Sequence, residues 1–252
     1  MEKHRGFTVG DPHARGTMLW LHGYTGAPDA FLDIAEEIAH ATGLEIHAPL
    51  LPGHGTREEN LLDYTYDDFV QAARHHAAEI YTPGRPFYVL GYSFGGYLAA
   101  HIAAKYAADA AIFALTPFTL RFPFSLPHVE KLLRAQTFWD KRLTQEDLRM
   151  REGTFYYPHA PYTSLPLIKE GNRRIVPILR NISCPILTLH NADDPLVSPR
   201  SGADMLAAAP RAHGSSAHVL PDGRHALFFR PEHSQEERLV LEFIQKNTPP
   251  SS

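Results

Sequence analysis

Cysteine is almost missing from this sequence. Cys184 is the only cysteine among 252 residues. A single cysteine excludes a disulfide framework, and it also excludes a metal cluster held by several thiolates. Because Cys184 lies between Ser183 and Pro185 at the start of an apolar run, we expect a buried and unreactive thiol.

An excess of basic charge is also missing. The chain has 24 Lys and Arg residues against 28 Asp and Glu residues, a formal net charge of −4. This balance offers no positive field to a nucleic-acid backbone, so we expect no nucleic-acid partner. The glycine-rich segment 91–96 lacks the lysine of a phosphate-binding loop, which argues against nucleotide binding.

Long apolar runs are missing too. The most apolar stretch, Leu98 to Phe118, is interrupted by His101, Lys105 and Asp109, whereas a membrane-spanning helix needs ~18 or more apolar residues in succession. Residues 1–16 contain no apolar core of a signal peptide. We therefore expect a cytoplasmic protein without a stable membrane anchor.

The composition that remains is ordinary for a globular protein, with 44% hydrophobic and 21% charged residues. Runs typical of strands alternate with helical patterns, and this alternation predicts a mostly parallel sheet with helices on both faces. Because ~250 residues often form one α/β domain, we expect a single domain over residues 1–252. The expected strands are 18–21, 45–48, 87–90, 110–115, 185–189 and 217–220, and the expected helices are 29–42, 66–81, 94–108, 200–209 and 235–246.

The alternation of strands and helices breaks between about residues 118 and 180. This stretch is dense in prolines and aromatic residues, and it shows no long strand pattern. Prolines shorten helices and are excluded from central strands. We therefore expect an inserted cap of short helices over about 118–180.

The strongest chemical signal is the segment Gly91-Tyr92-Ser93-Phe94-Gly95-Gly96, which joins an expected strand to an expected helix. A G-x-S-x-G pattern in this context is typical of a nucleophile elbow, a sharp turn that exposes the serine hydroxyl. A serine that only capped a helix would leave the glycines after it unexplained. Ser93 is therefore the candidate nucleophile.

A serine nucleophile needs a histidine base, and the base needs an acid to orient it. In the strand–elbow–helix fold the expected chain order is serine, acid, histidine. Five histidines fit this order, and His225 is favoured because it follows a glycine-containing loop after a strand; the others are His190, His213, His218 and His233. For the acid, Asp193 and Asp194 both follow the strand 185–189, and Asp222 is more typical of a turn residue.

Acyl transfer also needs donors for a developing oxyanion. The backbone N–H that follows the nucleophile belongs to Phe94. The second donor should come from the loop after an early strand, and His22-Gly23-Tyr24-Thr25-Gly26 ends such a strand, which favours the Tyr24 N–H. The alternative is a glycine-rich turn without a chemical role.

With these residues in view, the sequence resembles an α/β-hydrolase of the bacterial carboxylesterase and monoacylglycerol lipase group. The matching motifs are His22-Gly23-Tyr24-Thr25-Gly26, Pro52-Gly53-His54-Gly55, the segment 91–96, Asp194-Pro195-Leu196-Val197 and Gly223-Arg224-His225. The resemblance implies Asp194 as the acid, although Asn191 stands where the group's Gly-x-x-Asp-x-x-Val pattern has glycine. It also implies the Tyr24 oxyanion donor and a small cap. The Pro52–Gly55 loop is read as structural, near the active site.

These features together predict hydrolysis of short- to medium-chain acyl esters or monoacylglycerols through Ser93, Asp194 and His225. We expect no cofactor, no metal and a small-molecule ester as the partner, while the oligomeric state is left open. Alternatives are a thioesterase, a lactonase, an amidase or a C–C hydrolase on the same scaffold, or a non-catalytic ligand-binding protein. Aromatic cap residues are expected to contact the substrate, with Phe122, Phe138, Trp139 and Tyr157 as candidates.

Overall fold

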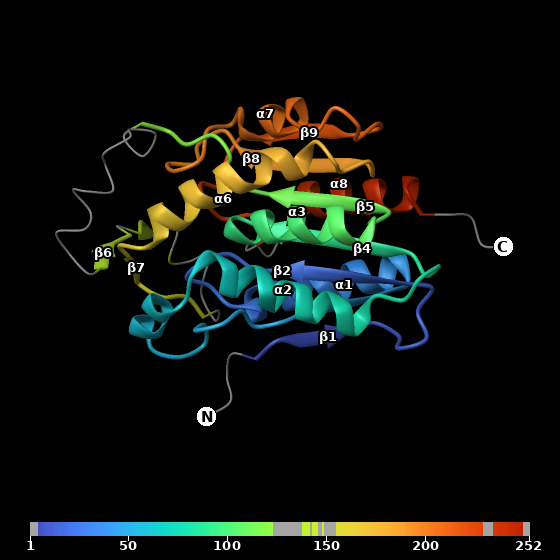
Figure 1. The fold of residues 1–252 in the computed structure, drawn as a ribbon, viewed down its shortest axis with the longest axis horizontal. Coiled ribbons are helices and arrows are strands. Elements are labelled where there is room, and N and C mark those ends of the chain that lie inside the picture. Colours follow the sequence, from blue (N-terminus) through green and yellow to red (C-terminus); the bar gives the residue numbers. More distant parts are fainter. Residues whose placement is uncertain are drawn as a thin grey trace.

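The computed structural model describes residues 5–122, 138–141, 143–145, 148, 155–228 and 234–248. Its centre is a seven-stranded sheet with the strand order β1-β3-β2-β4-β5-β8-β9 (Figure 1). All neighbouring strands are parallel except β1, which pairs antiparallel with β3. The strands are β1 (Phe7–Val9), β2 (Gly16–Leu21), β3 (Leu44–Ala48), β4 (Phe87–Tyr92), β5 (Ala110–Ala114), β8 (Ile186–Asn191) and β9 (Ser216–Leu220).

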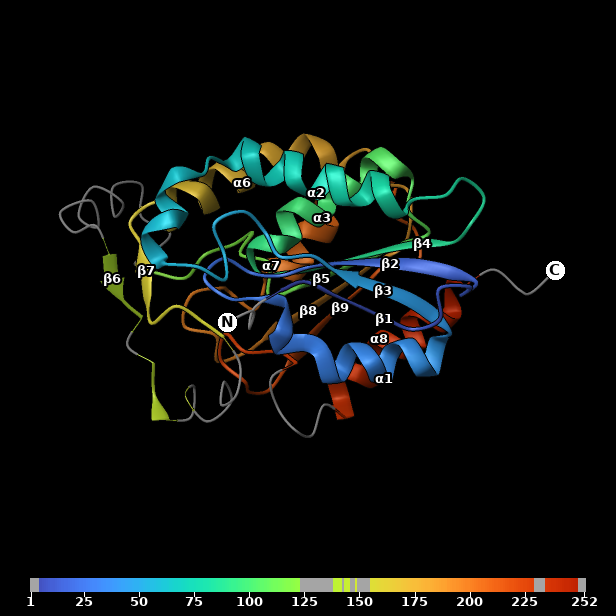
Figure 2. The same cartoon turned by 90° about the horizontal axis from the view of Figure 1, so that it is seen from below.

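Helices cover both faces of this sheet, so the chain forms three layers (Figure 2). One face carries α2 (Tyr66–Ile80), α3 (Phe94–Tyr106), α6 (Ser164–Leu179) and α7 (Ser201–Ala207). The other face carries α1 (Leu32–Thr42), preceded by the 3-10 helix η1 (Pro28–Phe31), and α8 (Ser234–Lys246). A second 3-10 helix, η2, spans Glu58–Asp63. The predicted fold class, a mostly parallel sheet between helices, is confirmed.

Strand β4 shows why the sheet needs cover on both sides. All six of its residues are buried, as expected for a parallel strand between two helical layers. Successive side chains point to opposite faces, so Phe87 and Val89 join the core under α2 and α3. Tyr88 and Leu90 join the core under α1 and α8. The strand therefore anchors both layers and ends at the elbow.

Helix ends follow the sequence signals. Thr65 caps α2: its hydroxyl accepts from the Asp68 N–H, and the Asp68 carboxylate accepts from the Thr65 N–H. This reciprocal arrangement is a capping box. Helix α1 ends at Gly43, which adopts a left-handed φ of 66°. Glycine has no Cβ to oppose that conformation.

The region between β5 and β8 differs from the expectation of short helices. Helix α6 has 16 residues and contains Pro177 in its last turn. A proline inside a helix costs ~3 kcal/mol, but α6 buries Leu167, Ile175 and Leu179 in the core. Each such burial contributes ~1.5–3 kcal/mol, so packing outweighs the proline. Helix α6 is therefore part of the layer over the sheet, and the prediction of short helices is wrong for it.

A small antiparallel pair lies beyond the carboxyl ends of the parallel strands (Figure 1). It consists of β6 (Phe138–Asp140) and β7 (His159–Pro161). These strands, and residues 155–158 before β7, lie within the range 118–180 that was predicted to form a cap. Because active sites of open α/β sheets lie at the carboxyl ends of the strands, this segment is positioned over the candidate site.

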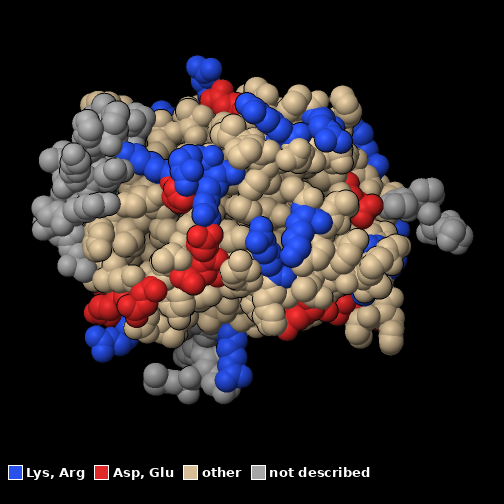
Figure 3. Space-filling model, in the orientation of Figure 1, with Lys and Arg blue, Asp and Glu red and all other residues tan. Residues whose placement is uncertain are grey.

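The surface over α2, α3 and α6 carries charges of both signs. Lys and Arg side chains lie beside Asp and Glu side chains on this face (Figure 3). Arg174 of α6 forms an ion pair with Asp67 of α2. Its Nε also lies 2.9 Å from Oε1 of Glu170 on the same helix. The ion pair between Arg174 and Asp67 links two neighbouring helices at the surface.

Candidate active site

Ser93 occupies a strained turn between β4 and α3. Its backbone has φ 50° and ψ −118°, a conformation that costs free energy for a residue with a Cβ. The flanking glycines explain how the turn fits. A Cβ at Gly91 would lie 2.4 Å from the Gly95 carbonyl oxygen, and a Cβ at Gly95 would lie 2.1 Å from the Leu21 carbonyl oxygen. The predicted elbow is present, and it places Ser93 at the amino end of α3.

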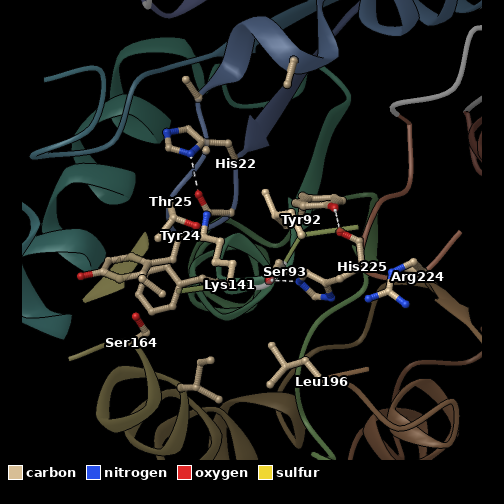
Figure 4. A pocket seen from close by; sticks show the side chains of 18 of the residues that line it. His22, Tyr24, Thr25, Tyr92, Ser93, Lys141, Ser164, Leu196, Arg224 and His225 are labelled. Carbon is tan, nitrogen blue, oxygen red and sulfur yellow. Dashed lines mark hydrogen bonds between the residues drawn. The ribbon is translucent and has the colours of Figure 1, made fainter. Parts of the chain in front are cut away.

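Ser93 and the two predicted partners form one hydrogen-bonded line, of which Figure 4 shows the bond between Ser93 and His225. The Ser93 Oγ lies 2.9 Å from His225 Nε2, and His225 Nδ1 lies 2.6 Å from Asp194 Oδ2. A carboxylate only accepts, so Nδ1 of the imidazole carries the proton and Nε2 can accept from the serine hydroxyl. The geometry distinguishes Asp194 from Asp193, which the residue pattern alone left open.

Asp194 is held as a buried acceptor. The residue is only 1% exposed. Its Oδ1 accepts from the backbone N–H groups of Leu196 at 2.8 Å and Val197 at 2.9 Å. Buried charge is tolerated only where hydrogen bonds replace water, and here two amides and one imidazole do so. The same bonds orient Oδ2 toward His225.

The loop before His225 is tied to the end of β8 and to the elbow. Asp193 Oδ1 accepts from the Arg224 N–H at 2.8 Å, and the Asn191 side-chain amide donates to the Arg224 carbonyl at 2.8 Å. Arg224 has a left-handed φ of 50°. The Tyr92 hydroxyl donates to the His225 carbonyl at 3.0 Å. Asp193 therefore anchors the loop that precedes His225 to the end of β8.

The other histidine candidates lie elsewhere. His190 is 1% exposed at the end of β8, and its Nε2 donates to the Thr116 carbonyl at 3.1 Å. Burial lowers the pKa of His190 to about 4. His218 bonds the Ser216 hydroxyl on β9 at 3.2 Å. His213 lies in the loop before β9, and His233 lies outside the described residues.

The two predicted oxyanion donors lie beside Ser93. Phe94 is the first residue of α3, where N–H groups lack intrahelical partners. His22 Nδ1 donates to the Gly23 carbonyl at 2.9 Å (Figure 4). In a trans peptide the C=O and the following N–H point in opposite directions. Fixing the Gly23 carbonyl on His22 therefore fixes the direction of the Tyr24 N–H.

Two buried histidines join the loop that contains Tyr24 to the Pro52–Gly55 loop. His22 Nε2 accepts from the Leu51 N–H at 3.0 Å, and His54 Nε2 accepts from the Thr25 N–H at 3.3 Å. Their rings meet edge-on with centroids 4.7 Å apart. Burial holds the pKa of His22 well below its usual range and lowers the pKa of His54 to about 4. Both rings are therefore neutral acceptors at physiological pH.

A cavity of about 350 Å³ opens at Ser93 and His225. Most of its lining is apolar, which suits a hydrocarbon group. The apolar side chains of the described lining come from η1, β7, α6 and connecting loops, and include Ala27, Ala30, Phe31, Leu143, Phe155, Ala160, Leu165, Ile168, Pro195 and Leu196. Lys141, Ser164 and Arg224 add polar atoms to the wall.

The described lining does not include the four cap residues that were expected to contact the substrate. Phe122 is 78% exposed. Tyr157 is only 4% exposed, and its hydroxyl donates a hydrogen bond to the Gly53 carbonyl in the Pro52–Gly55 loop. Phe138 pairs with Pro161 in the β6–β7 ladder. The side chain of Trp139 lies outside the described part of the structure. The structure therefore corrects the expected positions of Phe122 and Tyr157.

Sequence reasoning missed the contribution of α6 to the cavity. Leu165 and Ile168 were assigned to a cap of short helices, yet both line the wall near Ser93. The apolar spacing at 165, 168, 175 and 179 was the available signal. It was obscured by Pro166 and Pro177.

Neither a metal cluster nor a membrane span is found where the structure can be described. Within those residues, no three His, Cys, Asp or Glu side chains are placed to hold a metal ion. No helix of the described residues is long and apolar enough to cross a bilayer.

A parallel sheet with an elbow serine beside a histidine and a buried carboxylate defines the α/β-hydrolase class. A model of the alpha/beta hydrolase family matches residues 18–235. The chain belongs to this family, and the resemblance predicted from its motifs is confirmed.

Individual relatives agree with this placement. The chain is 33% identical over 86 residues to a thermostable monoacylglycerol lipase of Bacillus sp. (strain H-257). The aligned segment covers 34% of each chain. It is 29% identical over 168 residues to the mouse serine hydrolase BPHL, covering 62% of this chain and 54% of that one. The chain thus spans between about a third and a half of the length of these curated relatives.

A solved structure from a study of two metagenome-derived lipolytic enzymes, LipS and LipT, has the same fold. Its TM-score to this chain is 0.79 at 20% identity, and the superposition covers 97% of this chain and 98% of the other. At this identity the likeness is one of fold.

Proposed function

We propose that this chain is a serine hydrolase that cleaves carboxylic esters through an acyl-enzyme on Ser93. The observation that carries the proposal is the hydrogen-bonded line from Ser93 through His225 to Asp194 at the wall of an apolar cavity. The relatives named monoacylglycerol lipase and serine hydrolase support the same reaction class. The reaction requires no cofactor.

In the acylation step, His225 Nε2 takes the proton of the Ser93 hydroxyl as Oγ bonds the ester carbonyl carbon. The carbonyl oxygen becomes an oxyanion, which the Tyr24 and Phe94 N–H groups stabilise. Asp194 keeps the proton on His225 Nδ1 and stabilises the imidazolium. The C–O bond to the alcohol then breaks, and His225 gives its proton to the departing alcohol oxygen.

Deacylation repeats these steps with water. His225 takes a proton from water as the water oxygen bonds the acyl carbon. A second oxyanion forms at the same two N–H groups. The bond to Ser93 Oγ breaks, the serine regains a proton from His225, and the carboxylic acid leaves.

The substrate is proposed to be a neutral ester with a short to medium acyl chain, or a monoacylglycerol. Each buried CH₂ contributes ~0.8 kcal/mol, which corresponds to about a fourfold gain in kcat/KM per methylene. The gain should stop when the cavity of about 350 Å³ is full. The proposed substrate class can be tested with a series of p-nitrophenyl esters from acetate to palmitate. Their kcat/KM values are compared with those of matched acyl-CoA thioesters and of lactones. If palmitoyl-CoA or a lactone were the best substrate, the ester assignment would fail.

Ser93→Ala tests the nucleophile. We expect kcat for p-nitrophenyl butyrate to fall by ~10⁴-fold or more, and we expect a fluorophosphonate probe to label only the unsubstituted protein. Thermal unfolding should be little changed, because alanine fits the elbow as well as serine. A purified Ser93→Ala protein that kept a tenth of the activity would exclude this mechanism.

A further inference from the structure

The cap segment before β7 lies directly against the loop that contains Tyr24. Tyr156 forms an antiparallel bridge with Gly26, and the Tyr157 N–H donates to the Thr25 carbonyl at 3.0 Å. The Lys141 ammonium, just after β6, donates to the Tyr157 carbonyl. A segment 130 residues away in the chain is thus paired, backbone to backbone, with the loop of the proposed oxyanion site.

The Tyr157 side chain makes a second connection. Its hydroxyl donates to the Gly53 carbonyl at 3.2 Å and accepts from the Thr56 N–H at 3.1 Å. A phenol has one proton to donate and lone pairs to accept, so both bonds can exist together. Burial raises the pKa of Tyr157, which keeps the hydroxyl protonated. Tyr157 therefore bridges the Tyr24 loop and the Pro52–Gly55 loop.

The backbone pairing reaches Thr25 directly, and the hydroxyl bonds reach it through the loop of His54, whose Nε2 accepts from the Thr25 N–H. Thr25 has a left-handed φ of 72°, which is unfavourable for a β-branched side chain. Such strain persists only where the surroundings hold the residue from several sides. Here the Thr25 N–H is held by His54 Nε2, and the Thr25 carbonyl is held by the Tyr157 N–H. Thr25 directly follows Tyr24, and the peptide group between them carries the N–H that His54 holds, so the turn that contains Tyr24 is fixed on its carboxyl side.

We propose that Tyr157 is a positioning residue of the oxyanion site, through which the cap holds the strained Tyr24–Thr25 turn in its active conformation. The inference rests on the proposed ester hydrolysis at Ser93. Tyr157 acts on the transition state without touching the substrate, which differs from the substrate contact expected from its position in the cap. The cap thereby completes the catalytic machinery in addition to covering the acyl cavity.

Tyr157→Phe removes the two hydroxyl bonds and keeps the ring and the backbone pairing. We expect kcat/KM for p-nitrophenyl butyrate to fall roughly tenfold, less than the ~10²–10³-fold loss that follows removal of an oxyanion donor. The Ki of a trifluoromethyl ketone, whose hemiketal oxygen occupies the oxyanion site, should rise by the same factor. The Ki of the matched methyl ketone, which binds as a ground-state carbonyl, should not change. Tyr162→Phe, a cap tyrosine without a role in this network, is the matched control.

A double-mutant cycle with His54→Gln adds an independent measurement. Because His54 and Tyr157 hold the same turn, the two losses in kcat/KM should be strongly non-additive. The proposal is overturned if Tyr157→Phe behaves like Tyr162→Phe, if both ketones lose affinity equally, or if the two losses multiply independently. Failure of the proposed function looks different: ester hydrolysis would be missing in the unsubstituted protein or would survive Ser93→Ala.

Discussion

Asp193 and Asp194 are neighbours in the chain, but they have different environments. Asp194 uses one oxygen for two backbone amides and the other for His225. Asp193 accepts from the Arg224 N–H, one residue before the imidazole. The Asp194 carboxylate sets the tautomer of His225. The Asp193 carboxylate helps to place the loop that carries His225.

This difference predicts unequal effects of the same substitution. Asp194→Asn should lower kcat by ~10⁴-fold, because an amide at that position favours the wrong imidazole tautomer. Asp193→Asn keeps an oxygen that can accept from Arg224, so it should lower kcat by less than ~10-fold. Steady-state kinetics on p-nitrophenyl butyrate measures both. Equal losses, or a larger loss in Asp193→Asn, would contradict the assignment of Asp194.

At the scale of elements, α6 supports α3 at a close contact. A Cβ at Gly171 would lie 2.5 Å from the ring of Tyr97. Tyr97 is fully buried on α3, and its hydroxyl donates to the Pro117 carbonyl at 2.8 Å. The absence of a side chain at Gly171 therefore lets α6 approach the helix that begins at the elbow.

Gly171→Ala tests this contact. Alanine is the better helix former by ~1 kcal/mol, so a position without tertiary constraint would gain stability. We expect the opposite here, a loss of ~1–3 kcal/mol in the free energy of unfolding, because the Tyr97 ring has to move within a packed core. Urea unfolding measures the change, with the exposed position Arg173→Ala as the control. A stabilised Gly171→Ala protein would show that the two helices are not closely packed.

At the scale of the whole molecule, buried neutral histidines connect stability to pH. His22, His54 and His190 are almost inaccessible to solvent. Burial lowers the pKa of each, to about 4 for His54 and His190. In the unfolded chain the same groups titrate near their ordinary pKa of ~6.5. Between these values the unfolded state binds more protons, so acid favours unfolding.

The free energy of unfolding should therefore be highest above pH ~6.5 and should fall as the pH decreases toward 4. Each such histidine contributes a slope of up to ~1.4 kcal/mol per pH unit in this window. Urea unfolding at several pH values measures the total slope. His54→Gln removes one titrating group. It should therefore reduce the slope by the contribution of one histidine, up to ~1.4 kcal/mol per pH unit. An unchanged slope in His54→Gln would show that His54 is not buried as a neutral ring.

Much of the candidate site was predictable because its signals are local. The glycines around Ser93 indicate a tight turn, which predicts the elbow. The loop before His225 follows a clear strand pattern, which favours His225 as the base. Helix α6 was harder to predict because its prolines oppose its apolar spacing, and only burial against α3 decides between them. The short antiparallel strand β1 has three residues, too few to give a periodic signal.

The sequence by itself determined the alternation of the main strands and helices outside residues 118–180, the elbow at Ser93 and the two oxyanion candidates. These features depend on neighbouring residues, whose spacing is visible in the chain. Residue spacing left Asp193 and Asp194 open, the family resemblance favoured Asp194, and the tertiary structure brings Asp194 to His225. Only the tertiary structure decided that α6 lines the cavity and that the Tyr157 N–H bonds the Thr25 carbonyl. Such contacts join segments from 31 to more than 130 residues apart. They follow from the register of the sheet and the packing of its layers, which local sequence patterns do not encode.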